Sequence, residues 1–69
     1  MPEHDETLLE LAQRHVTVGE SLVAEQRAII ARLRSQGDST GDAERLLATM
    51  EETLRLMRKH LAYEQSRRR

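Results

Sequence analysis

The chain has 69 residues, no cysteine, a formal net charge of −1 and a single aromatic residue, Tyr63. This length allows one domain at most, and so short a chain commonly needs a disulfide, a metal or a partner to bury enough surface. The lack of cysteine excludes disulfides and thiolate metal sites, and it favours a reducing compartment. Because Ala, Leu, Glu and Arg dominate the composition, we expect a helical bundle or coiled coil.

The first ten residues, MPEHDETLLE, are acidic and lack the basic segment and apolar run of a secretory signal peptide. No apolar stretch approaches the roughly 20 residues that a membrane-spanning helix needs. We therefore expect a cytoplasmic protein that does not engage a membrane.

A first helix is predicted over about residues 3–36. Pro2 suits the first helical position, and the acidic residues Glu3, Asp5 and Glu6 complement the positive end of the helix dipole. Farther along, mostly apolar residues recur at alternating steps of three and four, which is the spacing of a heptad repeat. This seam consists of Leu9, Ala12, Val16, Gly19, Val23, Gln26, Ile30 and Leu33.

The segment SQGDSTGD, residues 35–42, predicts a turn at 37–40. Gly37 suits the left-handed backbone position just past a helix, and Ser39 or Thr40 suits the N-cap of the next one. A second helix is predicted over about 41–66, with a basic tail at 67–69. Its seam consists of Ala43, Leu47, Met50, Leu54, Met57 and Leu61.

Such a short connection makes the two helices antiparallel neighbours, so the predicted fold is all-α, a single helical hairpin. Counted outward from the turn, Gly19 should lie near His60 and Leu61. Glycine in a helix interior costs about 1 kcal/mol relative to alanine, so Gly19 indicates close helix packing, with a local kink as the alternative.

The first helix carries more apolar surface than the second can cover. Its apolar arc spans about half of the circumference, against about 100° on the second helix. We therefore predict that two hairpins form a homodimeric four-helix bundle through the first helix. The residues expected in self-association are Leu8, Leu11, His15, Val18, Gly19, Leu22, Gln26 and Ile29.

Gln26 occupies a seam position where an apolar residue is expected. A buried polar group there can fix helix register or partner choice at a cost in stability. A hydrogen bond to Thr53, which should face Gln26 from the second helix, is the alternative.

His15 and His60 should lie on neighbouring turns at the open end of the hairpin, with Glu64 nearby. These are ligand types for a divalent metal, but neither helix has the spacing of a di-metal bundle. A pH response of assembly is the favoured reading, and no metal or cofactor is expected. Because no nucleophile–base pair or phosphate-binding loop is present, no catalytic residue is assigned and an enzyme is not expected.

Two further surfaces are candidates for partner binding. Leu56 and Tyr63 should form a patch on the outer side of the second helix that could dock another protein helix, although scattered surface apolarity is the alternative. Arg67, Arg68 and Arg69 could contact nucleic acid. Three cations after a helix C-terminus are equally explained by the helix dipole, and no basic face exists elsewhere, so nucleic acid is not the favoured partner.

Four stretches carry a resemblance to known sequences: HVTVGE (15–20), QRAIIARL (26–33), GDSTGDAERLL (37–47) and MEETLRLMRKH (50–60). Together they resemble a group of short, uncharacterised bacterial helical-hairpin proteins, over nearly the whole chain. The resemblance implies a helical hairpin without an assigned substrate. In outline the architecture is also similar to Rop-type plasmid RNA-binding hairpins, whose basic face is not evident in this chain.

The sequence thus favours a small self-associating structural or interaction protein. The alternative is a nucleic-acid-binding or regulatory hairpin that uses the Arg-rich C-terminal end.

Overall fold

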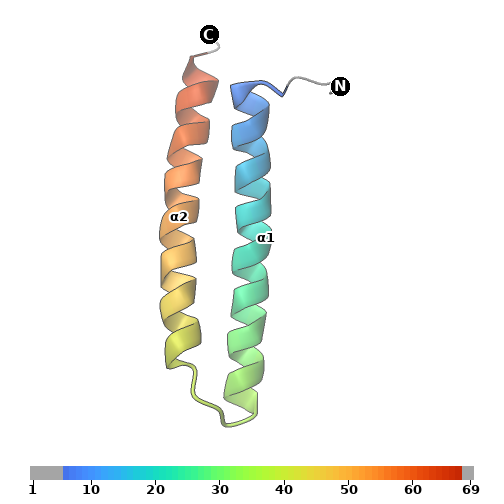
Figure 1. Cartoon of the computed structure of the whole chain (residues 1–69), viewed down its shortest axis with the longest axis vertical. Coiled ribbons are helices and arrows are strands. Elements are labelled where there is room, and N and C mark those ends of the chain that lie inside the picture. The colour runs from blue at the N-terminus through green and yellow to red at the C-terminus, as the bar shows by residue number, and fades with distance from the viewer. Residues whose placement is uncertain (1–5, 68–69) are drawn as a thin grey trace.

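The computed structural model describes residues 6–67, which form two helices, α1 (Leu8–Ser35) and α2 (Gly41–Ser66). The helices lie side by side and antiparallel, joined at one end by a short connection (Figure 1). Within 6–67 there is no strand, so the predicted all-α hairpin is confirmed. Pro2, Glu3, Asp5, Arg68 and Arg69, which entered the sequence predictions, lie outside the described residues.

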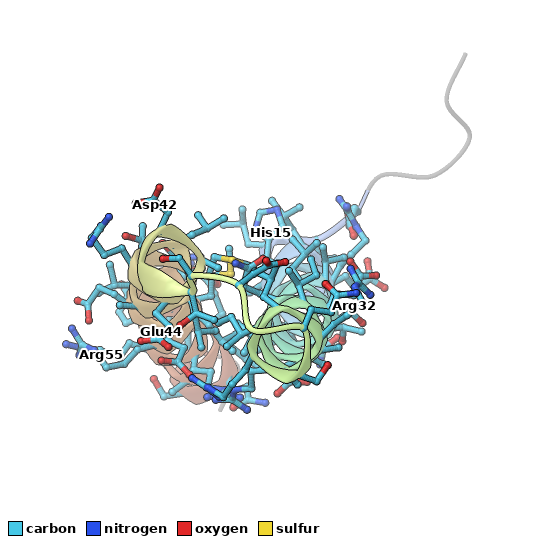
Figure 2. All side chains as sticks on the ribbon, turned by 90° about the horizontal axis from the view of Figure 1, so that it is seen from below. His15, Arg32, Asp42, Glu44 and Arg55 are labelled. Atoms are coloured by element: carbon cyan, nitrogen blue, oxygen red, sulfur yellow. The ribbon has the colours of Figure 1, made fainter. Side chains whose placement is uncertain are left out.

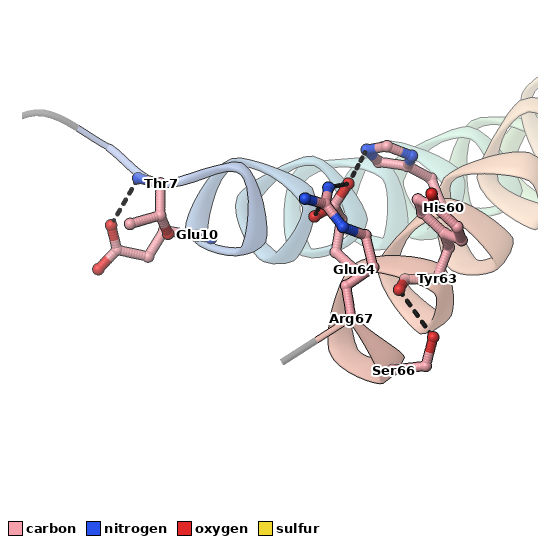
Figure 3. Close-up of polar contacts among 7 residues, drawn as sticks. All are labelled: Thr7, Glu10, His60, Tyr63, Glu64, Ser66 and Arg67. Carbon is pink, nitrogen blue, oxygen red and sulfur yellow. Dashed lines mark hydrogen bonds and ion pairs between the residues drawn. The ribbon is translucent and has the colours of Figure 1, made fainter. Parts of the chain in front are cut away.

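The helix α1 begins at Leu8, later than the predicted start near residue 3, because Thr7 caps it. The Thr7 hydroxyl accepts a hydrogen bond from the backbone N–H of Glu10 at 3.0 Å. The Glu10 carboxylate accepts one from the backbone N–H of Thr7 at 3.0 Å (Figure 3). This reciprocal pair satisfies N–H groups that have no partner inside a helix. Thr7 itself has an extended backbone, with φ −72° and ψ 165°.

The connection closes α1 with a Schellman motif. The N–H of Asp38 donates to the carbonyl of Leu33 at 2.9 Å, and the N–H of Gly37 donates to that of Arg34 at 3.1 Å. The motif needs a left-handed residue, which glycine adopts without steric penalty. Gly37 has φ 76°, so the left-handed position predicted for it is confirmed.

Thr40 is the N-cap of α2, but its side chain does not bond a backbone N–H. Its hydroxyl instead donates to the carboxylate of Glu44 at 2.7 Å. This hydrogen bond lowers the pKa of Glu44, and the nearby guanidinium of Arg34 lowers it further. The start of α2 is thus stabilised by a hydrogen bond between two side chains, and not by one from a backbone N–H to the N-cap side chain.

The helices meet in a register different from the predicted one. A β-carbon on Gly19 would lie 3.1 Å from Leu54 Cδ1 and 3.3 Å from Met57 Sδ, so Gly19 faces these residues and not His60 and Leu61. The predicted register is wrong by about one turn. Non-helical residues such as 38–40 advance up to about 3.3 Å each, against about 1.5 Å for helical ones. The connection therefore carries α2 farther toward the open end than a residue count suggests.

The core is a single seam between the two helices. The shortest dimension of the chain is 13 Å, about the diameter of one helix, so each helix keeps most of its circumference uncovered. Buried positions on α1 are Ala12, Val16, Gly19, Val23, Gln26 and Ile30, and those on α2 are Leu54 and Glu64. Leu47, Met50, Met57 and Leu61 are only partly buried. The seam of α1 is thus covered better than that of α2.

Candidate self-association surface

Three ion pairs bridge the helices along one side of the seam, which we call the ion-pair side. They are Glu20–Arg58 at 3.0 Å, Arg27–Glu51 at 2.6 Å and Arg34–Glu44 at 2.8 Å. On each helix these residues recur every seven positions, so they form one continuous row. All six side chains remain well exposed, and each such pair contributes only about 0.2–1 kcal/mol.

The opposite side of the seam is lined by aliphatic side chains, threonines and two histidines. Two shallow grooves run along it. The first, of about 240 Å³, is lined by Ala12, His15, Thr53, Leu56, Met57 and His60. The second, of about 140 Å³, is lined by Gly19, Leu22, Thr49, Met50, Thr53, Leu54 and Met57. Because Thr53 and Met57 belong to both, the grooves form one continuous depression.

Further apolar side chains extend this side along the hairpin. Leu8 and Ile29 lie seven residues from His15 and Leu22 on α1, and residues spaced by seven share a helix face. The same spacing from Thr53 and Leu56 places Leu46 and Tyr63 there on α2. We call this side the apolar face. It comprises Leu8, Leu11, His15, Val18, Leu22 and Ile29 of α1, with Leu46, Thr49, Thr53, Leu56, His60 and Tyr63 of α2.

The two sides are visible when the hairpin is viewed along its length (Figure 2). Asp42 and His15 lie on one side of the plane through the helices, and Glu44 and Arg55 lie on the other. Apart from Leu11, which is half-buried, the large apolar side chains of the apolar face are 37–59% exposed. The exposed large apolar side chains are therefore gathered on the side opposite the three ion pairs.

Of the residues predicted for self-association, Leu8, Leu11, His15, Val18, Leu22 and Ile29 lie on the apolar face. Gly19 and Gln26 lie in the seam. Gln26 is 8% exposed, and its Nε2 donates to the carbonyl of Ala43 at 3.0 Å. The alternative, a bond to Thr53, is wrong, because the amide of Gln26 bonds Ala43 instead. The Thr53 hydroxyl donates to the carbonyl of Thr49, one turn earlier in α2.

Leu56 does not lie on the outer side of α2, where the sequence placed it. It lines the groove between the helices together with His15 and His60. The sequence pattern did not predict this contribution of Leu56 to the groove. The proposed docking patch, Leu56 with Tyr63, and the apolar stripe of α1 therefore form one surface.

The open end of the hairpin holds a polar cluster around Glu64, which the sequence placed near His60 without predicting its burial or its contact with Arg67 (Figure 3). Glu64 is 5% exposed, and its carboxylate lies 3.3 Å from Nη1 of Arg67 and 3.8 Å from Nε2 of His60. The Arg67 guanidinium also lies 5.8 Å from the centroid of the Tyr63 ring. The burial of Glu64 could have been predicted, because Glu64 follows Leu61 by three residues and so continues the seam.

Other kinds of site find little support in the described part of the chain. Within residues 6–67, no group of three or more His, Asp or Glu side chains is placed to hold a metal ion. Neither α1 nor α2 combines the length and the apolar character required to cross a membrane.

Comparison of the chain with protein-family models, curated proteins and solved structures gave no significant match. The resemblance to short bacterial hairpin proteins therefore stays a prediction. What this molecule does must be inferred from the contrast between its apolar face and its ion-pair side.

Proposed function

We propose that the chain is a small self-associating interaction protein of the cytoplasm, whose apolar face packs against the same face of a second copy. The product is a homodimeric four-helix bundle. The observation that carries this proposal is the segregation of exposed apolar side chains onto one side of the hairpin, opposite the three ion pairs.

The exposure of individual apolar side chains supports the proposal. Leu22, Leu46 and Leu56 alone are each about half exposed. A contiguous apolar surface of this kind on a small protein marks an interaction site.

The dimensions of the apolar face suit a second copy of the hairpin. The 28 residues of α1 span about 42 Å, and two neighbouring helices are about 20 Å wide, so the face measures roughly 800 Å². That is the area each partner buries in a stable interface of standard size. A single helix from another protein, about 10 Å wide, would cover only half of it. A second copy covers all of it and completes a two-layer core.

Substitution of Leu22 tests the proposal. Leu22 lines the second groove and is 48% exposed in the hairpin, so Leu22→Glu should leave the hairpin folded and place a charge in the interface. Two such sites occur per symmetric dimer, so we expect the dissociation constant to rise at least about 100-fold. Light scattering on the eluting protein measures the mass, and circular dichroism measures the helix content.

Ala28→Glu is the matched control, because Ala28 is exposed and lies on the side of α1 away from the seam. We expect this variant to remain dimeric. A Leu22→Glu protein that is as dimeric as the control would show that the apolar face of α1 is not the interface.

A further inference from the structure

We infer that the two copies pack with their turns at opposite ends, so that Glu25 meets the partner's His15 and Asp42 meets the partner's Arg67. This inference rests on the proposed dimer and adds its geometry. It is carried by the order of the residues along the apolar face and of the charged residues that continue its heptad spacing, namely Glu25 and Arg32 on α1, with Asp42 and Arg67 on α2.

Two-fold symmetry allows two ways to place one hairpin face on another. If the axis runs along the helices, the turns lie at the same end and α1 covers the partner's α2. If the axis runs across the helices, the turns lie at opposite ends, α1 covers the partner's α1, and α2 covers the partner's α2.

The contacts within one hairpin define the level of each residue along it. Leu8 and Arg67 line one groove at the open end, His15 and His60 line the next, and Leu22 and Thr53 share the one after that. Steps of seven residues extend these levels toward the turn. Ile29 then lies level with Leu46, and Arg32, near the edge of the face, lies level with Asp42.

Glu25 is exposed and follows Val18 by seven residues, so it continues the apolar face of α1. With Glu25 included, the residues of this face are complementary about a point midway between Val18 and Leu22. Reversal of α1 about this point places Leu11 over the partner's Ile29, so that apolar side chains meet. The same reversal places His15 over the partner's Glu25, so that a carboxylate meets an imidazole. Both contacts occur twice in a symmetric dimer.

The residues of α2 on this side of the hairpin are also complementary when the helix is reversed, about a point midway between Thr53 and Leu56. Reversal places Leu46 over the partner's Tyr63 and Asp42 over the partner's Arg67. Asp42 and Arg67 are exposed, and their present partners, Arg45 and Glu64, lie on the same helix. A charge from a second copy can therefore add to these pairs.

The two centres lie at the same level of the hairpin. Leu22 of α1 and Thr53 of α2 line one groove, and Gly19 packs against Leu54 and Met57. One axis across the hairpin can therefore pass through both centres. Two independent helix sequences are thus self-complementary about a single axis.

The same-end arrangement fits the charges less well. In this arrangement, each level of one hairpin lies against the same level of the partner. Four histidine side chains, His15 and His60 from both copies, therefore meet at one level. Glu25 would face the partner's Thr49 rather than an imidazole, and Arg67 would face Leu8. Only Asp42, opposite the partner's Arg32, would gain an opposite charge.

A distance between the two turns tests the arrangement directly. Ser39 is exposed in the connection, and the chain has no cysteine, so Ser39→Cys accepts a single spin label. We expect pulsed electron paramagnetic resonance of the dimer to give a separation on the order of 50 Å. A separation below about 30 Å would overturn the antiparallel arrangement and leave the dimer intact. A purely monomeric sample would overturn the dimer as well.

A charge exchange provides a second test. His15 and Glu25 lie about 15 Å apart along one helix, so they interact only between copies. His15→Glu should weaken the dimer through repulsion from the partner's Glu25, and adding Glu25→Arg should recover about 2- to 30-fold in the dissociation constant. No recovery in the double variant, with helix content unchanged, would contradict the arrangement.

Discussion

At the residue scale, Gly19 sets how closely the two helices approach. Its missing side chain leaves room for Leu54 and Met57, and a β-carbon would already contact both at 3.1 and 3.3 Å. The glycine is therefore a packing feature of the hairpin seam, which is one of the two readings that the sequence left open. A kink at this position is not needed, because α1 is continuous from Leu8 to Ser35.

Gly19→Leu should overpack this contact and lower the free energy of unfolding by about 1–3 kcal/mol. Ala28→Leu adds the same side chain at an exposed position of the same helix and should change stability little. Thermal unfolding followed by circular dichroism, at one chain concentration for both variants, measures the difference. Equal unfolding midpoints for the two variants would show that Gly19 is not tightly packed.

The role of a single residue could be predicted where local sequence determines it. It could not be predicted where it depends on a contact between the two helices. Gly37 was predictable because a left-handed position after a helix favours glycine. The hydrogen-bond partner of Gln26 was not, because its choice of the Ala43 carbonyl depends on how α2 slides against α1. The burial of Glu64 was open to prediction from the spacing of the seam, but its charge argued against it.

At the element scale, heptad spacing was enough to predict two helices and the seam between them. The predicted limits of the second helix, 41–66, coincide with those of α2. The start of α1 was misplaced because two signals compete near the N-terminus. The Pro2 signal favours an early start, whereas the pair Thr7 and Glu10 forms the capping box that the structure uses.

The start of α2 should be sensitive to acid. The pKa of Glu44 is lowered in the folded hairpin by the Thr40 hydroxyl and by Arg34, so the ionised carboxylate stabilises the fold above its unfolded-state pKa, near 4.5. This contribution is lost as the pH falls through the folded-state pKa of Glu44. Glu44→Gln should therefore lose less stability than the wild type when the pH is lowered from about 5.5 to 3.

The comparison is made by thermal unfolding at a series of pH values. Thr40→Val, which removes the donating hydroxyl, should reduce the acid sensitivity in the same direction as Glu44→Gln. If Glu44→Gln loses as much stability as the wild type over this range, the contacts of Glu44 do not contribute to the acid response.

At the scale of the whole molecule, the hairpin is a one-layer structure with two unlike sides. The ion pairs hold one side of the seam and can stay in water at little cost. The apolar face cannot stay in water at so little cost, because its free energy falls only when it is removed from water. The imbalance on α1 was predictable from sequence, but which residues of α1 share a groove with Leu56 depended on the register between the helices.

The central claim is that the hairpin covers its apolar face with a second copy of itself. Sedimentation equilibrium of the intact chain at micromolar concentration tests it most directly. We expect a mass of twice the 8.0 kDa of one chain, with the helix content of α1 and α2 retained. A fully helical species of 8.0 kDa that persists as the concentration is raised would contradict the claim.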